Sequence, residues 1–216
     1  MIITAIVPSH RREGRFDIQA DGRPLATVSL DTVERLELGV GVAIDHERER
    51  LVLEAAEALA VYDRALNMLA VQGRSARDLR KRLIQKGEPA PLVDQAIERL
   101  TTIGLLDDAQ FARSLARSKA VGQGASKRRV QQEMFKRGVA RDVADEAIAE
   151  VFEEEAVDEA ENAEAAARKK LRSLTDVDAE TRRRRLYGFL ARRGYAPDAI
   201  RETLERVLEE EIGTDA

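Results

Sequence analysis

The chain has 216 residues, of which 44% are apolar and 35% charged, a composition typical of a folded, soluble protein of one large or two small domains. It has no cysteine, which excludes disulfides, thiolate nucleophiles and the usual zinc sites. No segment approaches the roughly 18 consecutive apolar residues of a membrane span, and residues 1–7 lack the basic start of a signal peptide. We therefore expect a cytoplasmic protein that does not contact a membrane.

The net charge of −4 is unevenly distributed along the chain. Residues 142–167 hold eleven acidic side chains and no basic one, whereas residues 182–193 hold six arginines and no acid. Because the charges are separated in this way, the acidic average argues only weakly against a nucleic-acid partner.

The first 45 residues predict a small β-rich module. Alternating apolar and polar residues, together with the hairpin dipeptide Asp21-Gly22, predict short strands at residues 2–7, 16–20 and 25–30. Asp31 is then expected to cap a short helical turn that ends near Leu36. The alternative is an irregular arm without a core of its own, since two or three short strands are marginal by themselves.

From residue 46 onward, three copies of one pattern surround Gly87, Gly138 and Gly194. Apolar residues stand eight and four positions before each glycine, and six, ten and thirteen positions after it. The fifteen residues are Leu79, Leu83, Val93, Ile97, Leu100, Val130, Met134, Ala144, Ile148, Val151, Leu186, Leu190, Ile200, Leu204 and Val207. These spacings place each apolar set on one helix face, and the glycine between them suits the left-handed position that follows a helix end.

A leading helix is expected before each of these helix pairs, at residues 62–71, 107–121 and 153–174. Each repeat therefore has a leading, a middle and a third helix. We predict a mainly α protein: three tandem three-helix repeats in an extended, curved array, preceded by the β-rich module. The predicted boundaries are 1–45 for the module and 46–104, 105–152 and 153–216 for the repeats.

The middle helices are basic, and the third helices are acidic or mixed. Ten residues before each glycine, away from the expected core face, stands an arginine: Arg77, Arg128 and Arg184. Stacked repeats should align these helices into a basic stripe that faces phosphates or the acidic rim of a protein filament. The full candidate set is Arg77, Lys81, Lys127, Arg128, Arg129, Arg184 and Arg185. The alternative is that these side chains are solvated or form ion pairs with the acidic helices.

Other polar motifs favour structural roles over catalysis. Asp107 and Asp108 could form a metal site or an acid–base pair, but Asp107 fits better as a helix cap with Gln110 completing a capping box. The sequence GQGASK at residues 122–127 has the wrong order for a phosphate loop and predicts an interhelical turn with Ser126 as a cap.

Little in the sequence supports catalysis or cofactor binding. The two histidines, His10 and His46, have no neighbouring cysteine, third histidine or nucleophile, so we expect no enzymatic activity, no metal and no cofactor. Tryptophan is absent, and several of the eight other aromatic residues occupy apolar repeat positions. This argues against base stacking as the main means of holding a DNA strand and favours contact through phosphates.

Four segments resemble motifs of the RecX family. They are GLLDDAQFA at Gly104–Ala112, QQEMFKRG at Gln131–Gly138, LARRGY at Leu190–Tyr195, and Arg64-Ala65-Leu66 followed by Ser75–Leu83. The similarity covers residues 62–210, and the N-terminal stretch is similar to that of longer family members. The acidic segment 142–167 and the four arginines at 182–185 depart from the pattern.

The resemblance implies a regulator of the RecA filament on single-stranded DNA, acting in recombination, DNA repair and the SOS response. Such a protein lies in the filament groove, promotes disassembly and limits strand exchange, ATP hydrolysis and coprotease activity. We expect it to act as a monomer. One alternative is a helix-turn-helix transcription factor, although no cluster of Asn, Gln and Arg for base reading is present. Another is a helical-repeat adaptor that binds only proteins.

Overall fold

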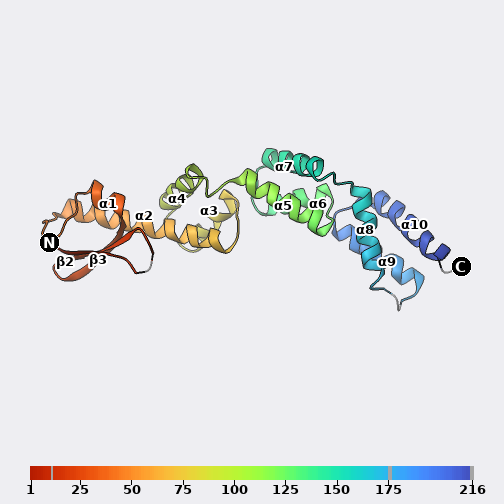
Figure 1. Ribbon diagram of the computed structural model, residues 1–216, viewed down its shortest axis with the longest axis horizontal. Coiled ribbons are helices and arrows are strands. Elements are labelled where there is room, and N and C mark those ends of the chain that lie inside the picture. The colour runs from red at the N-terminus through yellow and green to blue at the C-terminus, as the bar shows by residue number, and fades with distance from the viewer. Residues whose placement is uncertain (11, 175–176, 215–216) are drawn as a thin grey trace. The chain divides into compact units, whose positions relative to one another are not determined.

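The computed structural model describes residues 1–10, 12–174 and 177–214, and these form three strands and ten helices (Figure 1). The chain divides into two compact units. The N-terminal unit comprises Met1–Gly73 and Leu79–Leu106, and the C-terminal unit comprises Arg74–Asp78 and the residues from Asp107 onward. The mainly helical fold with a small β-rich start is as predicted.

The first element of the N-terminal unit is an antiparallel sheet of β1 (Ile3–Pro8), β2 (Arg15–Ala20) and β3 (Arg23–Ser29), in that order. The β2–β3 turn has the two positive φ angles that favour a tight hairpin, 48° at Asp21 and 75° at Gly22. The sheet has a core of its own, formed by Ile3, Ile18, Val28, Leu36, Leu38, Ile44 and Val52. An irregular N-terminal arm is therefore excluded.

The short helix α1 (Leu30–Arg35) begins two residues earlier than expected. Its cap is Ser29, whose side chain accepts a hydrogen bond from the Thr32 amide at 3.3 Å, and not Asp31. Asp31 lies in the first turn instead, where a negative charge favours the positive end of the helix dipole.

The leading helix of the first repeat, α2 (His46–Val71), is 26 residues long, much longer than the predicted 62–71. Asp45 caps it by accepting the Arg48 amide at 2.8 Å. Val52 belongs to the sheet core, and α2 also packs against α4. One helix is therefore part of both the β-rich module and the first repeat. The domain boundaries predicted from the sequence stay predictions.

The remaining helices occur in the predicted order. The first repeat continues with α3 (Ala76–Gln85) and α4 (Ala90–Thr102). The second consists of α5 (Asp108–Gln123), α6 (Lys127–Lys136) and α7 (Arg141–Glu154). The third consists of α8 (Glu159–Leu171), α9 (Ala179–Arg192) and α10 (Pro197–Thr214).

The expected start of the third leading helix, at residue 153, is wrong. The preceding helix α7 continues to Glu154, and the chain then turns at Ala156, whose φ is 46°. Asp158 begins α8 by accepting hydrogen bonds from the amides of Ala160 and Glu161. A left-handed residue followed by a capped helix start separates the two helices.

The repeat pattern corresponds to the helical cores. All six apolar positions of the middle helices are fully buried, and of the nine positions after the glycines only Ile97 is half-buried. The three glycines have φ angles of 89°, 77° and 88°. After α6, for example, the Val139 amide donates to the Met134 carbonyl at 3.1 Å, as a left-handed helix end requires.

Candidate nucleic-acid interface

The arginine ten residues before each glycine is exposed in all three copies. Arg77, Arg128 and Arg184 thus point away from the buried positions of their helices, as the periodicity predicts. All three belong to the C-terminal unit, because that unit includes the first residues of α3.

Two of the seven candidate residues have partners within their own repeat. Arg129 forms an ion pair with Glu133 at 2.8 Å. The Lys127 ammonium lies 5.1 Å from the centre of the Phe152 ring, a cation–π contact that links α6 to α7. The structure therefore favours structural roles for these two side chains.

The other five candidates are exposed and have no hydrogen bond or ion pair with any residue that the structure describes: Arg77, Lys81, Arg128, Arg184 and Arg185. Some other basic residues of the same helices differ. Arg80 of α3, for example, donates to Asp94 at 2.6 Å, and this hydrogen bond lowers the pKa of the Asp94 carboxyl. Intramolecular ion pairing thus accounts for Arg80 but not for these five.

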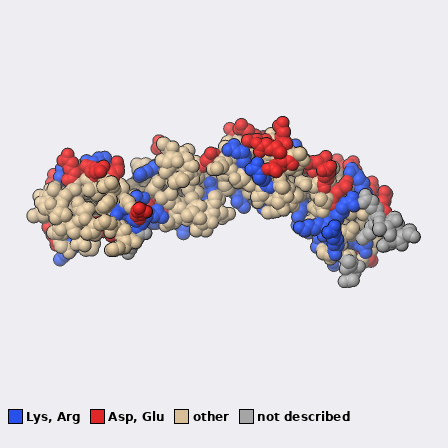
Figure 2. Space-filling view, in the orientation of Figure 1, with Lys and Arg blue, Asp and Glu red and all other residues tan. Residues whose placement is uncertain are grey.

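Arg183 was missed by the sequence analysis, although it meets the same criteria of exposure and absence of a polar partner among the described residues. It lies between Arg182, which donates to the Val177 carbonyl at 3.4 Å, and Arg184. Basic side chains gather over α8 and α9 (Figure 2). The end of α8 carries the exposed residues Lys169 and Arg172. In the sequence, the only signal for Arg183 is the high density of arginines and the absence of acidic residues at positions 182–193.

Middle helices of successive repeats meet end to end in the C-terminal unit. The Ser126 amide at the start of α6 donates to the Arg193 carbonyl at the end of α9, at 3.1 Å. Gly194 packs so closely there that an added Cβ would lie 2.7 Å from the Arg129 Cβ. The second junction repeats the arrangement, since the Ser75 hydroxyl donates to the Arg137 carbonyl and Gly138 abuts Arg77.

An acidic residue completes each junction. Asp108, the first residue of α5, accepts the Ala76 amide at 2.7 Å, and Glu159, the first residue of α8, accepts the Lys127 amide at 3.0 Å. Each carboxylate satisfies an amide that the first turn of a helix leaves without a partner. Neither role was predicted from the sequence, although Asp108 and Glu159 stand 51 residues apart, the same spacing as Gly87 and Gly138.

Asp107 is the cap of α5, as predicted, and accepts the Gln110 amide at 2.9 Å. Within the described residues, Gln110 makes no side-chain hydrogen bond back to Asp107, so the capping box is incomplete. Ser126 caps α6, also as predicted. No cluster of three or more metal-ligating residues occurs in the part of the chain that the structure describes.

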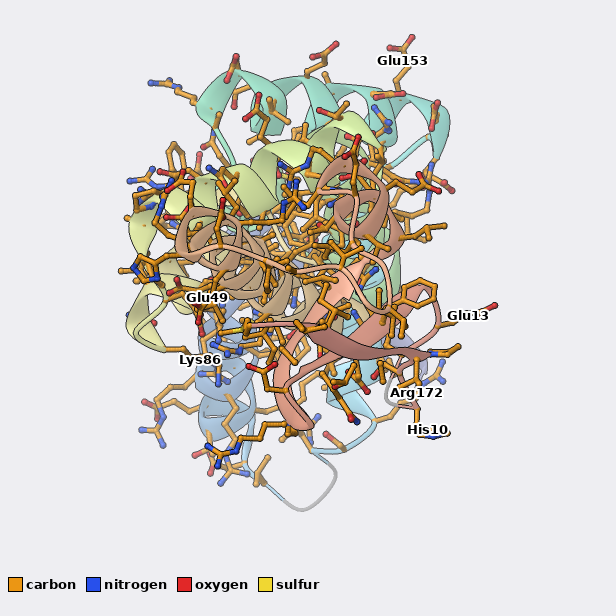
Figure 3. The ribbon with its side chains drawn as sticks, turned by 90° about the vertical axis from the view of Figure 1, so that its left-hand side faces the viewer. His10, Glu13, Glu49, Lys86, Glu153 and Arg172 are labelled. Carbon is orange, nitrogen blue, oxygen red and sulfur yellow. The ribbon has the colours of Figure 1, made fainter. Side chains whose placement is uncertain are left out.

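The acidic segment 142–167 forms ion pairs mainly within its own repeats. Glu154 and Glu155 bind Arg117 at 3.0 and 2.5 Å, and Glu164 binds Arg206 at 2.5 Å. Other acids face solvent, as Glu153 does at the end of α7, and acidic side chains gather over that helix (Figures 2 and 3). The segment therefore links helices within repeats, and among the described residues it forms no ion pair with Arg77, Arg128, Arg184 or Arg185.

Comparison with known proteins identifies the family. The models of the first, second and third three-helix domains of RecX match residues 62–100, 107–148 and 157–204. Regulatory protein RecX of Amycolatopsis mediterranei (strain U-32) is 37% identical, over 68% of this chain and 79% of that protein. The chain belongs to the RecX family.

Other RecX proteins are also similar to this chain. Regulatory protein RecX of Mycobacterium avium (strain 104) is 35% identical over 64% of this chain and 79% of its own length. Regulatory protein RecX of Levilactobacillus brevis is 27% identical, and the match covers only 44% of that protein's length. A crystal structure of regulatory protein RecX shares the fold with a TM-score of 0.70, at 22% identity, over 96% of this chain and 98% of that chain.

None of the helices that the structure describes is long and apolar enough to cross a membrane.

Proposed function

We propose that this chain binds the RecA filament on single-stranded DNA and inhibits or remodels it, limiting its recombinase, ATPase and coprotease activities. Membership of a family of regulatory proteins supports the proposal. The observation that carries it is the set of exposed basic residues on the middle helices without acidic partners among the described residues.

Cations of this kind suit a phosphate backbone or an acidic protein surface. A side chain without an intramolecular ion pair gives up no existing interaction when it binds, and each phosphate contact releases counterions from the DNA. Because one exposed charge contact contributes little, affinity must come from several contacts together. The repetition of Arg77, Arg128 and Arg184 supplies these contacts from successive repeats.

Regulation of this kind requires binding but no chemistry on a substrate. We propose that the chain acts as a monomer in the cytoplasm, with no cofactor and no catalytic residue. Backbone contact through arginines suits a filament whose DNA sequence varies, whereas a transcription factor would need side chains arranged to read base edges.

The test is a filter-binding titration with single-stranded DNA at several salt concentrations, first without RecA and then with it. We expect tighter binding to the RecA-coated strand and a salt dependence that reports phosphate contacts. Preference for one duplex sequence would instead indicate a transcription factor. No binding to DNA or to the filament would indicate an adaptor for other proteins, and either result would contradict the proposal.

A further inference from the structure

Two of the eight aromatic side chains are exposed, and both lie on middle helices of the C-terminal unit. Phe135 on α6 is 53% exposed and Tyr187 on α9 is 39% exposed. The other six, all within the described residues, are buried or half-buried. Single exposed apolar residues are common on protein surfaces, but the restriction of both exposed rings to the basic helices requires an explanation.

Each ring shares its helix face with arginines that have no polar partner among the described residues. Arg128 precedes Phe135 by two helical turns, and Arg183 and Arg184 precede Tyr187 by one turn. Between Arg128 and Phe135 lies the exposed amide of Gln132. Neither ring has an acidic residue three or four positions away along its helix. Along its own helix, each ring therefore has only cationic or uncharged neighbours one turn away.

The two helices that carry these rings follow one another within the C-terminal unit. The end of α9 meets the first turn of α6, through the Ser126–Arg193 hydrogen bond and the close packing of Gly194. Along this succession of helices, a cation and an aromatic ring are followed by a second cation and a second ring. A polyanion that carries flat, apolar groups at regular intervals is complementary to such an order.

We propose that Phe135 and Tyr187 stack on unpaired bases of single-stranded DNA while the neighbouring arginines contact its phosphates. The inference rests on the proposed function and deepens it, because it assigns part of the affinity to the bases themselves. Stacking on an aromatic ring tolerates any sequence, since every base has a π face. Bases in a duplex are already stacked on one another, so the surface selects single strands.

The direct test uses a tryptophan reporter in a chain that otherwise has none. The Phe135→Trp variant is titrated, without RecA, with an oligothymidine of about 20 nucleotides, long enough for more than one protein contact. The expected result is quenching of the tryptophan fluorescence by the oligothymidine and little quenching by an abasic strand with the same phosphates. Equal responses to the two strands, or no response to either at low salt, would overturn the proposal.

Affinity measurements with matched variants provide the second test. Phe135→Leu and Tyr187→Leu should each weaken binding to the oligothymidine by about fivefold or more, the lower end of the effect of losing one stacked base. Phe135→Tyr and Tyr187→Phe keep a π face and should bind like wild type, as should the control Val121→Ala, an exposed apolar residue of α5. The salt dependence should not change, because no phosphate contact is lost.

The same variants separate this inference from the proposed function. Leucine variants that bind the oligothymidine normally but no longer inhibit RecA would show that the rings contact protein. That result would overturn stacking and leave the regulatory function intact. Base-dependent quenching in the Phe135→Trp variant, combined with wild-type protein that does not affect RecA, would support stacking and contradict the regulatory function.

Discussion

Replacing each of the three repeat glycines by alanine, one at a time, should destabilise the protein. The loss of stability should increase with how closely the glycine packs against the adjoining repeat. All three glycines have φ angles near 80–90°, where an L-residue costs about 1–2 kcal/mol. At Gly87 an added Cβ meets nothing within 4 Å, so Gly87→Ala has this conformational cost alone. At Gly138 the Cβ would lie 3.0–3.2 Å from side-chain atoms of Arg77, which can shift partly.

Gly194→Ala should cost the most. Its Cβ would lie 2.6 Å from the Ser126 hydroxyl, 2.7 Å from the Arg129 Cβ and 3.0 Å from the Arg129 backbone nitrogen. Because the backbone cannot move aside easily, overpacking should add about 1–3 kcal/mol to the conformational cost. Gly138→Ala should fall between the other two.

The assay is urea unfolding followed by far-UV circular dichroism, with hydrogen exchange of the Ser126 amide as a local measure. We expect that amide, which donates to the Arg193 carbonyl, to exchange faster in Gly194→Ala than in wild type. If Gly194→Ala costs no more than Gly87→Ala and leaves this exchange unchanged, the middle helices do not meet end to end in solution.

Three further predictions concern stability. Asp107→Ala should lower the free energy of unfolding by about 0.5–2 kcal/mol through loss of the cap, with inhibition of RecA per folded molecule unchanged; thermal unfolding and the ATPase assay check this. Ser29→Ala should lower the melting temperature more than Asp31→Ala does, and the reverse order would contradict the cap assignment of α1. Burial, followed by the charge of Glu159, raises the pKa of Tyr195 from 10.0 to about 12. Between about pH 10 and pH 12 the Tyr195 phenol is therefore neutral in the folded chain but ionised in the unfolded chain. The contribution of this phenol to the free energy of unfolding is present below pH 10 and lost as the pH rises toward 12. Urea midpoints at about pH 9 and about pH 11.5 should differ less in Tyr195→Phe than in wild type.

The helical cores could be predicted from the sequence because burial follows helical periodicity. Leu79, Val130 and Leu186 stand at one repeat position and are all fully buried, and the exposed arginines two residues earlier follow from the same geometry. The glycines could also be placed, because few other residues tolerate a left-handed helix end.

The pairing of individual side chains could not be predicted in this way. Asp108 and Glu159 lie 32 residues after the amides that they bind, so their roles depend on how successive repeats pack. Periodicity likewise could not distinguish Arg129, which pairs with Glu133, from its neighbour Arg128, which has no such partner among the described residues. Local propensity also missed the length of α2, which depends on packing against the sheet.

The most direct test of the account is inhibition of RecA-catalysed ATP hydrolysis on single-stranded DNA by a variant in which Arg77, Arg128 and Arg184 are all alanine. The matched control replaces three exposed, ion-paired arginines outside the middle helices, Arg50, Arg117 and Arg206, and loses the same charge.

At about 0.2–1 kcal/mol per exposed contact, the triple variant should need roughly three- to 150-fold more protein for half-inhibition, while its helicity is unchanged and the control inhibits like wild type. Its binding to single-stranded DNA should also lose about 0.7 in salt dependence for each phosphate contact removed. A folded triple variant that inhibits at the same concentration as wild type would contradict the claim that these arginines form the binding surface.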